Sequence, residues 1–249
     1  MQDDILFSYF TVEEAFLFAA KLKLNLPENQ MKTKVRKLMQ ELGLWEIRTT
    51  LIGDTMKKFI SGGERKRTAI GVEMITDPQL LLLDEPTSGL DSFKAFSIVK
   101  FMKQQALKGK TVLATIHQPS SEAYASFDKV IFMCDGHIVY QGPPKAVTQH
   151  FDGMFVFPKF ANPADIAMKI LSINYPKKPE DDKYVDSLVQ NYFKENAGKE
   201  KELSGKFLLG EVKIEKRFKA SCCLQFKTVC KRNGASIKRN PIVFKARVG

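Results

Sequence analysis

The feature that most constrains the fold is a short, wholly apolar run, residues 80–83, in which four leucines are followed by Asp84 and Glu85. Because the run has no polar position, it predicts a strand buried on both faces, as in a parallel sheet. A second apolar segment, residues 111–116, follows a predicted helix that Asp91 caps and Gly109 ends. This strand–helix–strand alternation predicts an α/β domain up to about residue 155.

Capping signals and apolar spacing predict the other elements. Two segments, 11–14 and 61–64, have the capping-box form, and predict helices from 11 to about 22 and from 61 to about 75. A helix is also predicted over 30–42. Asp135-Gly136, between apolar runs at 129–133 and 137–141, predicts a hairpin. Farther along, we expect a linker at 176–183, because it is rich in proline and charge, and an amphipathic helix over 219–232.

The charge is unevenly distributed along the chain. The 249 residues carry a net charge of +11, and residues 206–249 alone hold twelve basic and two acidic side chains. A 44% hydrophobic fraction excludes a wholly disordered chain. No uncharged apolar run reaches the roughly 18–20 residues that cross a bilayer, and the first residues do not resemble a secretory signal. The basic segment is compatible with nucleic acid, an anionic membrane surface or an acidic partner.

Asp84 and Glu85 lie where the predicted strand ends. Open α/β sheets bind ligands at the carboxyl ends of their strands. In nucleotide enzymes a first acidic residue there holds Mg²⁺, commonly through water, and a second can orient or deprotonate the attacking water. The alternative is a solvated acidic turn.

Two other segments could meet a phosphate. In Ser61-Gly62-Gly63-Glu64 the glycines allow close approach of the backbone to a ligand, and the amides at the helix N-terminus favour an anion. The alternative is a plain helix cap. His117 follows the second predicted strand and would lie beside Glu85 if the two strands are neighbours, although a histidine at such a position can also be purely structural.

Three blocks in this order carry a family resemblance: ISGGERKR at 60–67, LLLDEPTSGLD at 81–91 and TIHQPSS at 115–121. Together they closely resemble the nucleotide-binding domain of an ATP-binding-cassette (ABC) transporter, of the G subfamily of half-transporters. The resemblance is dense over residues 1–170 and extends thinly to Pro241. It implies an α/β, P-loop NTPase-like ABC cassette, with a parallel sheet, a helical subdomain, a C-terminal linker and a basic amphipathic helix.

The resemblance also implies roles for individual residues and implies ATP and Mg²⁺ as cofactors. Ser61, Gly62 and Gly63, with Glu64, match the signature that clamps the γ-phosphate of ATP held by the opposite subunit. Asp84 matches the Walker B aspartate for Mg²⁺, and Glu85 matches the catalytic glutamate that activates water. Asp91 matches the D-loop aspartate, which communicates across the dimer, and His117 matches the switch histidine on the γ-phosphate. Gln2 matches the Q-loop glutamine, which touches Mg²⁺ and relays the nucleotide state to the membrane domain.

The chain departs from the family pattern at two points. Lys58-Phe59 stands where the family usually has Arg-Gly before the signature. No G-x-x-x-x-G-K-[ST] motif occurs, although this phosphate-binding loop precedes the Q-loop in the family. We therefore expect an N-terminally incomplete cassette, either a fragment or a wrongly started gene model, that cannot hydrolyse ATP alone. The expected domains are a partial cassette at 1–158, an extension and linker at 159–205, and a juxtamembrane connecting segment at 206–249.

The resemblance implies a transporter moving a lipid-like or xenobiotic substrate, with a second nucleotide-binding domain and a transmembrane domain as partners. The chain would act at the cytoplasmic face of a membrane, with the basic segment near anionic lipid. Cys222, Cys223 and Cys230 are then sites of lipid attachment or, as we expect, small apolar packing residues. The alternative is a non-transport ABC-type protein or a regulatory dimer partner associated with ribosomes or nucleic acid, which the motifs make less favoured.

Overall fold

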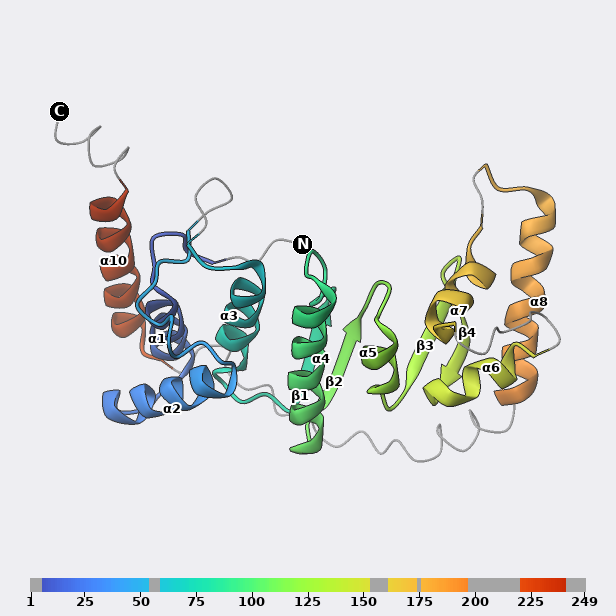
Figure 1. Cartoon of the computed structure of the whole chain (residues 1–249). Helices are drawn as coiled ribbons and strands as arrows, with labels where there is room; N and C mark the ends of the chain where they lie inside the picture. Colours follow the sequence, from blue (N-terminus) through green and yellow to red (C-terminus); the bar gives the residue numbers. More distant parts are fainter. Residues whose placement is uncertain (1–5, 54–58, 153–160, 174–175, 197–219, 241–249) are drawn as a thin grey trace. The chain divides into compact units, whose positions relative to one another are not determined.

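The computed structural model describes residues 6–53, 59–152, 161–173, 176–196 and 220–240, whose elements are labelled in Figure 1. Contacts divide the chain into two units. The first unit contains the described residues up to Ile116 together with the last helix, and the second begins at His117. This border coincides with neither residue 158 nor residue 205, so the three expected domains stay a prediction.

The first unit begins with α1 (Val12–Lys23), α2 (Glu28–Glu41) and, after a loop, α3 (Gly62–Met74). The predicted capping box of α1 is confirmed: Thr11 Oγ1 accepts a hydrogen bond from the Glu14 amide at 3.2 Å, and the Thr11 amide donates to Glu14 Oε2 at 2.9 Å. α1 packs against both α2 and α3. Phe16 of α1 is fully buried in the core of the first unit.

The parallel strand pair follows these helices. β1 (Leu80–Asp84) and β2 (Thr111–Thr115) are joined by α4 (Ser92–Leu107), and their register pairs Asp84 with Thr115 at the carboxyl ends. As predicted, the Asp91 carboxylate caps α4, and Gly109 after its end has a φ of +90° that favours glycine. The strand–helix–strand prediction is therefore confirmed.

The predicted burial of this sheet on both faces is wrong. Leu81 is buried, but Leu80 and Leu82 are 54% and 67% exposed, and Leu113 on β2 is 54% exposed. Among the described residues β1 pairs only with β2, and α4 packs against β2. Because successive side chains of a strand point to opposite faces, one helix can cover only half of the leucines.

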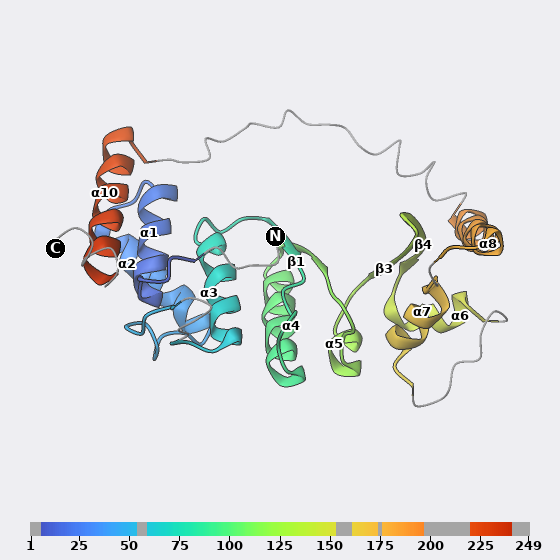
Figure 2. The same cartoon turned by 90° about the horizontal axis from the view of Figure 1, so that it is seen from above.

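The last helix, α10 (Cys222–Arg239), lies beside α1 although it is far away in sequence, as Figures 1 and 2 both show. It starts three residues later and ends seven residues later than predicted. The Arg232 guanidinium lies 4.6 Å from the centre of the Phe7 ring and 5.5 Å from that of Phe18, a cation–π arrangement. The middle of α10 thus contacts the first unit through Arg232.

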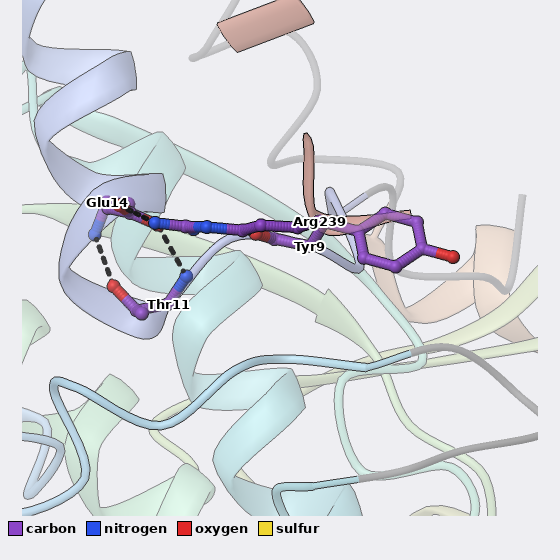
Figure 3. Close-up of polar contacts among 4 residues, drawn as sticks. All are labelled: Tyr9, Thr11, Glu14 and Arg239. Carbon is purple, nitrogen blue, oxygen red and sulfur yellow. Dashed lines mark hydrogen bonds and ion pairs between the residues drawn. The ribbon is translucent and has the colours of Figure 1, made fainter. Parts of the chain in front are cut away.

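A second attachment lies at the end of α10 (Figure 3). Arg239 donates from Nη1 to Glu14 Oε2 at 2.6 Å and from Nη2 to Glu14 Oε1 at 2.8 Å, and Nη1 also donates to the Tyr9 carbonyl at 2.8 Å. Two parallel bonds from a guanidinium to a carboxylate give a strong, directional contact. The pKa of Glu14 is accordingly lowered, chiefly by the hydrogen bonds from Arg239.

The second unit contains a hairpin with helices around it. Its elements are α5 (Ser121–Ala125), β3 (Val130–Cys134), β4 (His137–Gly142), the 3₁₀ helix η1 (Pro144–Ala146), α6 (Val147–His150), α7 (Pro163–Leu171) and α8 (Pro179–Asn196). Asp135 and Gly136 have φ values of +49° and +82°, as a two-residue turn of this kind requires. The antiparallel pairing of β3 and β4 confirms the predicted hairpin.

The predicted linker at 176–183 is partly wrong, because α8 begins inside it. Pro179 occupies the first position of the helix, where its missing amide costs nothing, and acidic residues follow in the first turn. The Asp181 carboxylate accepts a hydrogen bond from the Lys178 amide at 2.8 Å, which is half of a capping box. Val185 and Leu188 are buried, and α8 packs against β4.

Candidate functional site

The carboxyl end of the parallel strand pair is organised by one hydroxyl group. Thr115 Oγ1 donates to Asp84 Oδ1 at 2.7 Å and accepts from the Glu85 amide at 2.9 Å. The in-register pairing of Asp84 with Thr115 makes both bonds possible. Asp84 itself is exposed, so Thr115 fixes the direction of a carboxylate that a ligand can still reach.

The backbone of Glu85 is strained. Its φ is +43°, in the left-handed region that residues other than Gly, Asn and Asp seldom adopt. The residue is half-buried, its carbonyl accepts from the Ser88 amide at 3.1 Å, and the following Pro86 is buried. Strain of this kind persists where the surrounding structure enforces it, and it concentrates at functional sites.

The Ser61-Gly62-Gly63-Glu64 segment forms the start of α3 with a complete capping box. The Ser61 amide donates to Glu64 Oε2 at 2.7 Å, and Ser61 Oγ accepts from the Glu64 amide at 3.3 Å. Since Oγ acts as an acceptor in this bond, its hydrogen is left to donate to an anion. Ser61 and Gly62 are exposed, so solvent reaches this end of the helix. The unusual Phe59 is 48% exposed and leaves the capping box intact.

The structure brings this helix start close to the cap of α4. A β-carbon at Gly63 would lie 3.2 Å from Cδ of Lys94, and one at Gly62 would lie 3.5 Å from Cδ2 of Leu90. Lys94 in turn donates from its amide to Asp91 Oδ1 at 2.9 Å and pairs through Nζ with Oδ2 at 2.7 Å. The hydrogen bonds from Lys94 lower the pKa of Asp91. The signature-like segment and Asp91 are therefore neighbours.

The expected positions of two further site residues, His117 and Gln2, stay predictions. His117 is exposed and is the first residue of the second unit, whereas Asp84 and Glu85 belong to the first. Its expected place beside Glu85 stays a prediction. Gln2 lies outside the described residues, so its expected role also stays a prediction.

The residues present fit a magnesium ion bound together with a nucleotide better than a metal ion held by protein ligands alone. Among the described residues, no three His, Cys, Asp or Glu side chains gather to hold a metal ion. Mg²⁺ commonly keeps several waters and takes one or two protein carboxylates plus substrate phosphates. Asp84 can supply that single carboxylate, with Thr115 occupying only one of its oxygens.

Sequence reasoning missed two residues that shape these groups. Thr115 is one residue of the 115–121 motif, but its position at the end of β2, opposite Asp84 in a parallel pair, is the signal that indicates its bridging role. Lys94, three residues after Asp91 and on the same side of α4, has the spacing of an i,i+3 ion pair.

Comparisons with known proteins agree with the motifs. The chain is 35% identical to "Protein white" of Ceratitis capitata over an alignment of 257 residues, which covers 99% of this chain and 38% of that protein. It is 47% identical over 153 residues to "ABC transporter G family member 1" of Arabidopsis thaliana, covering 61% of this chain and 21% of that protein. The chain thus spans less than two fifths of the length of these relatives.

A solved structure also matches. The chain superimposes on cbiO1 from Clostridium perfringens, described as part of the ABC transporter complex cbiONQ, with a TM-score of 0.51 and 30% sequence identity, over 59% of this chain and 56% of that one. The fold class inferred from the motifs, the P-loop NTPase-like α/β fold of an ABC cassette, is therefore confirmed.

Two family models match successive parts of the chain. The "ABC transporter" model matches residues 1–88, and the "ABC-2 type transporter" model matches residues 117–197. Within the part of the chain that the structure describes, no helix has both the length and the apolar character that crossing a bilayer takes. From the ordered motifs, the cassette fold and these relatives together, we conclude that the chain belongs to the ABC transporter family, in its G subfamily.

Proposed function

We propose that this chain provides part of the nucleotide-binding domain of a G-type ABC transporter, in which ATP hydrolysis drives a lipid-like or xenobiotic substrate through a membrane domain. The observation that carries the proposal is the Thr115 bridge, which holds the Asp84 carboxylate and the Glu85 backbone together at the carboxyl end of a parallel strand pair. Open α/β sheets bind their ligands at this edge.

Each group at the strand ends has a definite task in this proposal. Asp84 would hold Mg²⁺, and Thr115, which donates to one oxygen of its carboxylate, would keep that carboxylate oriented for the role. Glu85 directs its carboxylate from a strained backbone and accepts a proton from the attacking water. Bound magnesium ATP supplies the phosphoryl group that passes to that water. His117 would donate to the terminal phosphate.

Ser61, Gly62, Gly63 and Glu64 serve a different nucleotide in this proposal. Their exposed helix start would face ATP held by a second nucleotide-binding domain, with the Ser61 hydroxyl and the first amides of α3 donating to the γ-phosphate. The closeness of Gly62 to Leu90 and of Gly63 to Lys94 supports coupling to Asp91, because a ligand bound at the helix start would lie near the cap of α4.

A first experiment addresses hydrolysis by the chain alone. The sequence contains no phosphate-binding loop, whose backbone amides and lysine supply most phosphate affinity in such enzymes. We therefore expect phosphate release from magnesium ATP to be no faster for the purified chain than for its Glu85→Gln variant. Substantial turnover that Glu85→Gln abolishes would refute the claim that the chain is inactive alone.

A second experiment addresses the role of Ser61. An intact G-type nucleotide-binding domain is disabled in its own signature serine, and the present chain is titrated into it. We expect ATPase activity to return, because the chain completes the partner's site. Ser61→Ala should abolish the rescue, whereas the matched Glu85→Gln variant should retain it, since Glu85 serves the other site. No rescue, or equal loss in both variants, would contradict the proposed division of roles.

A further inference from the structure

Two arginine side chains stack on Trp45, which follows the end of α2. The guanidinium carbon of Arg48 lies 4.5 Å from the centre of the Trp45 ring, and that of Arg36 lies 5.0 Å from it. Guanidinium groups stack well on aromatic rings because they are planar and weakly hydrated. Arg36 is exposed, and Trp45 and Arg48 are half-buried, so solvent reaches all three side chains. We name these three residues the arginine clamp.

The loop that carries Trp45 and Arg48 is fixed by hydrogen bonds. The Glu13 amide donates to the Arg48 carbonyl at 3.0 Å, and Arg48 Nη1 donates to the Trp45 carbonyl at 3.0 Å. The preceding Leu44 is fully buried, and its amide donates to the Met39 carbonyl at 2.8 Å. The guanidinium of Arg48 is therefore held in place before a ligand arrives, which reduces the entropy lost on binding.

The charge of the clamp is not neutralised by nearby carboxylates. The two acidic residues of α2 already have lysine partners, Glu28 at 3.0 Å and Glu41 at 2.8 Å. Glu46, the next residue after the ring, is exposed. Within the part of the chain that the structure describes, no carboxylate forms an ion pair with either guanidinium of the clamp. Both positive charges are therefore available to a negatively charged partner.

We propose that the arginine clamp binds an acidic peptide segment of a partner protein. Arg48 uses only Nη1 for the Trp45 carbonyl, so both guanidiniums keep N–H donors that can receive a carboxylate. Alternate residues of an extended peptide lie about 7 Å apart on one side. Two guanidiniums that each lie within 5.0 Å of one ring centre can receive a pair of carboxylates with that spacing.

This binding stands apart from the proposed function. The clamp contains none of the residues to which a role in ATP binding or hydrolysis is given, and its binding needs no nucleotide. A failure of peptide binding would therefore leave the expected ATPase results unchanged, and the converse also holds.

The same positive charge would attract RNA, but the arrangement favours a peptide. Single-stranded nucleic acid gains much of its affinity by stacking bases on aromatic rings. The Trp45 ring already carries two guanidiniums, so a base would have to displace one of them before it could stack. Carboxylates need no aromatic surface and reach the N–H donors directly.

Trp45 is the only tryptophan of the chain, so tryptophan fluorescence reports on the clamp alone. The full 249-residue chain is titrated, without nucleotide, with a peptide of alternating glutamate and glycine that is blocked at both ends. We expect a saturable shift of the emission to shorter wavelength, because the bound peptide excludes water from a half-buried ring. The matching peptide of alternating glutamine and glycine should give no shift. Peptide bound at the basic segment 206–249 would not give this signal.

Variants of the two arginines test which groups bind the peptide. Arg36→Gln with Arg48→Gln should weaken binding about fivefold for each guanidinium removed, as for an exposed ion pair. The matched control removes two exposed lysines of the second unit, Lys129→Gln with Lys194→Gln, and should leave the affinity unchanged. Arg36→Lys with Arg48→Lys keeps the charge but removes the planar donors, and should still weaken binding severalfold.

One variant keeps the test valid if the double Gln variant does not fold. Arg36→Gln alone leaves the bond from Arg48 to the Trp45 carbonyl intact, and it should still weaken peptide binding about fivefold.

The outcomes separate the possible partners. The absence of an emission shift, an equal shift with the glutamine peptide, or equal loss of binding in the lysine control and the Gln variants would each overturn the proposal. Full binding by the two-lysine variant would also overturn it, because it would show that charge alone is sufficient. Tighter binding at Trp45 of a single-stranded RNA with the same number of negative charges would overturn it in favour of nucleic acid.

Discussion

Replacing Arg239 by Met should loosen α10 from α1, because a single guanidinium makes both contacts at the end of the helix (Figure 3). Methionine keeps much of the aliphatic length, so the change removes mainly the charge and the donors. In this variant Arg232 of α10 still stacks over the rings of Phe7 and Phe18. We therefore expect the last turns of α10 to open more often, without loss of the rest of the first unit.

The magnitude follows from exposure. The side chains of Arg239 and Glu14 are each 38% exposed, so solvent screens the ion pair, and a value of about 0.5–1 kcal/mol is appropriate. The hydrogen bond to the Tyr9 carbonyl adds about 0.5–1 kcal/mol. Together, about 1–2 kcal/mol corresponds to amide exchange that is about five- to thirtyfold faster over the end of α10.

Hydrogen–deuterium exchange of peptides from α10 measures this effect. Glu14→Gln provides the matched partner, since its side-chain oxygen can still accept from the Thr11 amide and preserve the cap of α1. The double-mutant cycle with Arg239→Met should give a coupling of about 0.5–1 kcal/mol. A coupling near zero, or unchanged exchange over α10 in Arg239→Met, would refute the reasoning.

The same pair predicts a pH dependence. Arg239 lowers the pKa of Glu14 in the folded chain below its ordinary value of 4.5. Stabilisation from the ionised carboxylate is therefore fully present above pH 4.5 and is lost as pH falls through the lower folded pKa. Protection of α10 against exchange should fall over this window in the native chain. Arg239→Met should show a weaker dependence.

Three further predictions concern the first unit. Glu85→Gly should stabilise the chain by about 0.5–1 kcal/mol in urea unfolding, because glycine adopts a φ of +43° without strain; destabilisation would contradict this. Thr115→Val should cost about 1 kcal/mol in the same assay through loss of its two hydrogen bonds, with Thr111→Val at the other end of β2 as the control that costs less. Gly71→Ala should lower the free energy of unfolding by about 1–3 kcal/mol, because the new β-carbon would lie 2.6 Å from Phe16 Cε1. An unchanged free energy would show that the side chains between α1 and α3 rearrange at little cost.

The features that could be predicted from sequence are those determined by a few neighbouring residues. The capping boxes at Thr11 and Ser61 need only a hydroxyl and a carboxylate three residues apart, and both have the predicted hydrogen bonds. Asp135 and Gly136 adopt positive φ in the two-residue turn that their chemistry favours. The acidic pair at the carboxyl end of β1 also lies where it is predicted, because a strand end depends on the local change from apolar to charged residues.

The features that escaped prediction depend on distant contacts. Whether Leu80 and Leu82 are buried depends on which element covers the second face of the sheet. The apolar character of the two residues does not predict whether such an element is there. The segment 176–183 is predicted as a linker, but the start of α8 at Pro179 depends on the Asp181 carboxylate and on the packing of α8 against β4. The attachment of Arg239 to Glu14 joins residues 225 positions apart, a separation that no local pattern encodes.

The Thr115 bridge also favours the correct register of the two strands. Its bond to Asp84 spans 31 residues and forms only when β2 pairs with β1 in the observed register. A slip by one residue would carry the hydroxyl to the opposite face of the sheet, away from both Asp84 and the Glu85 amide. A chain with the wrong register would therefore lose both hydrogen bonds and the orientation of the acidic pair at the same time. The arrangement of Asp84 and Glu85 thus requires the correct strand pairing.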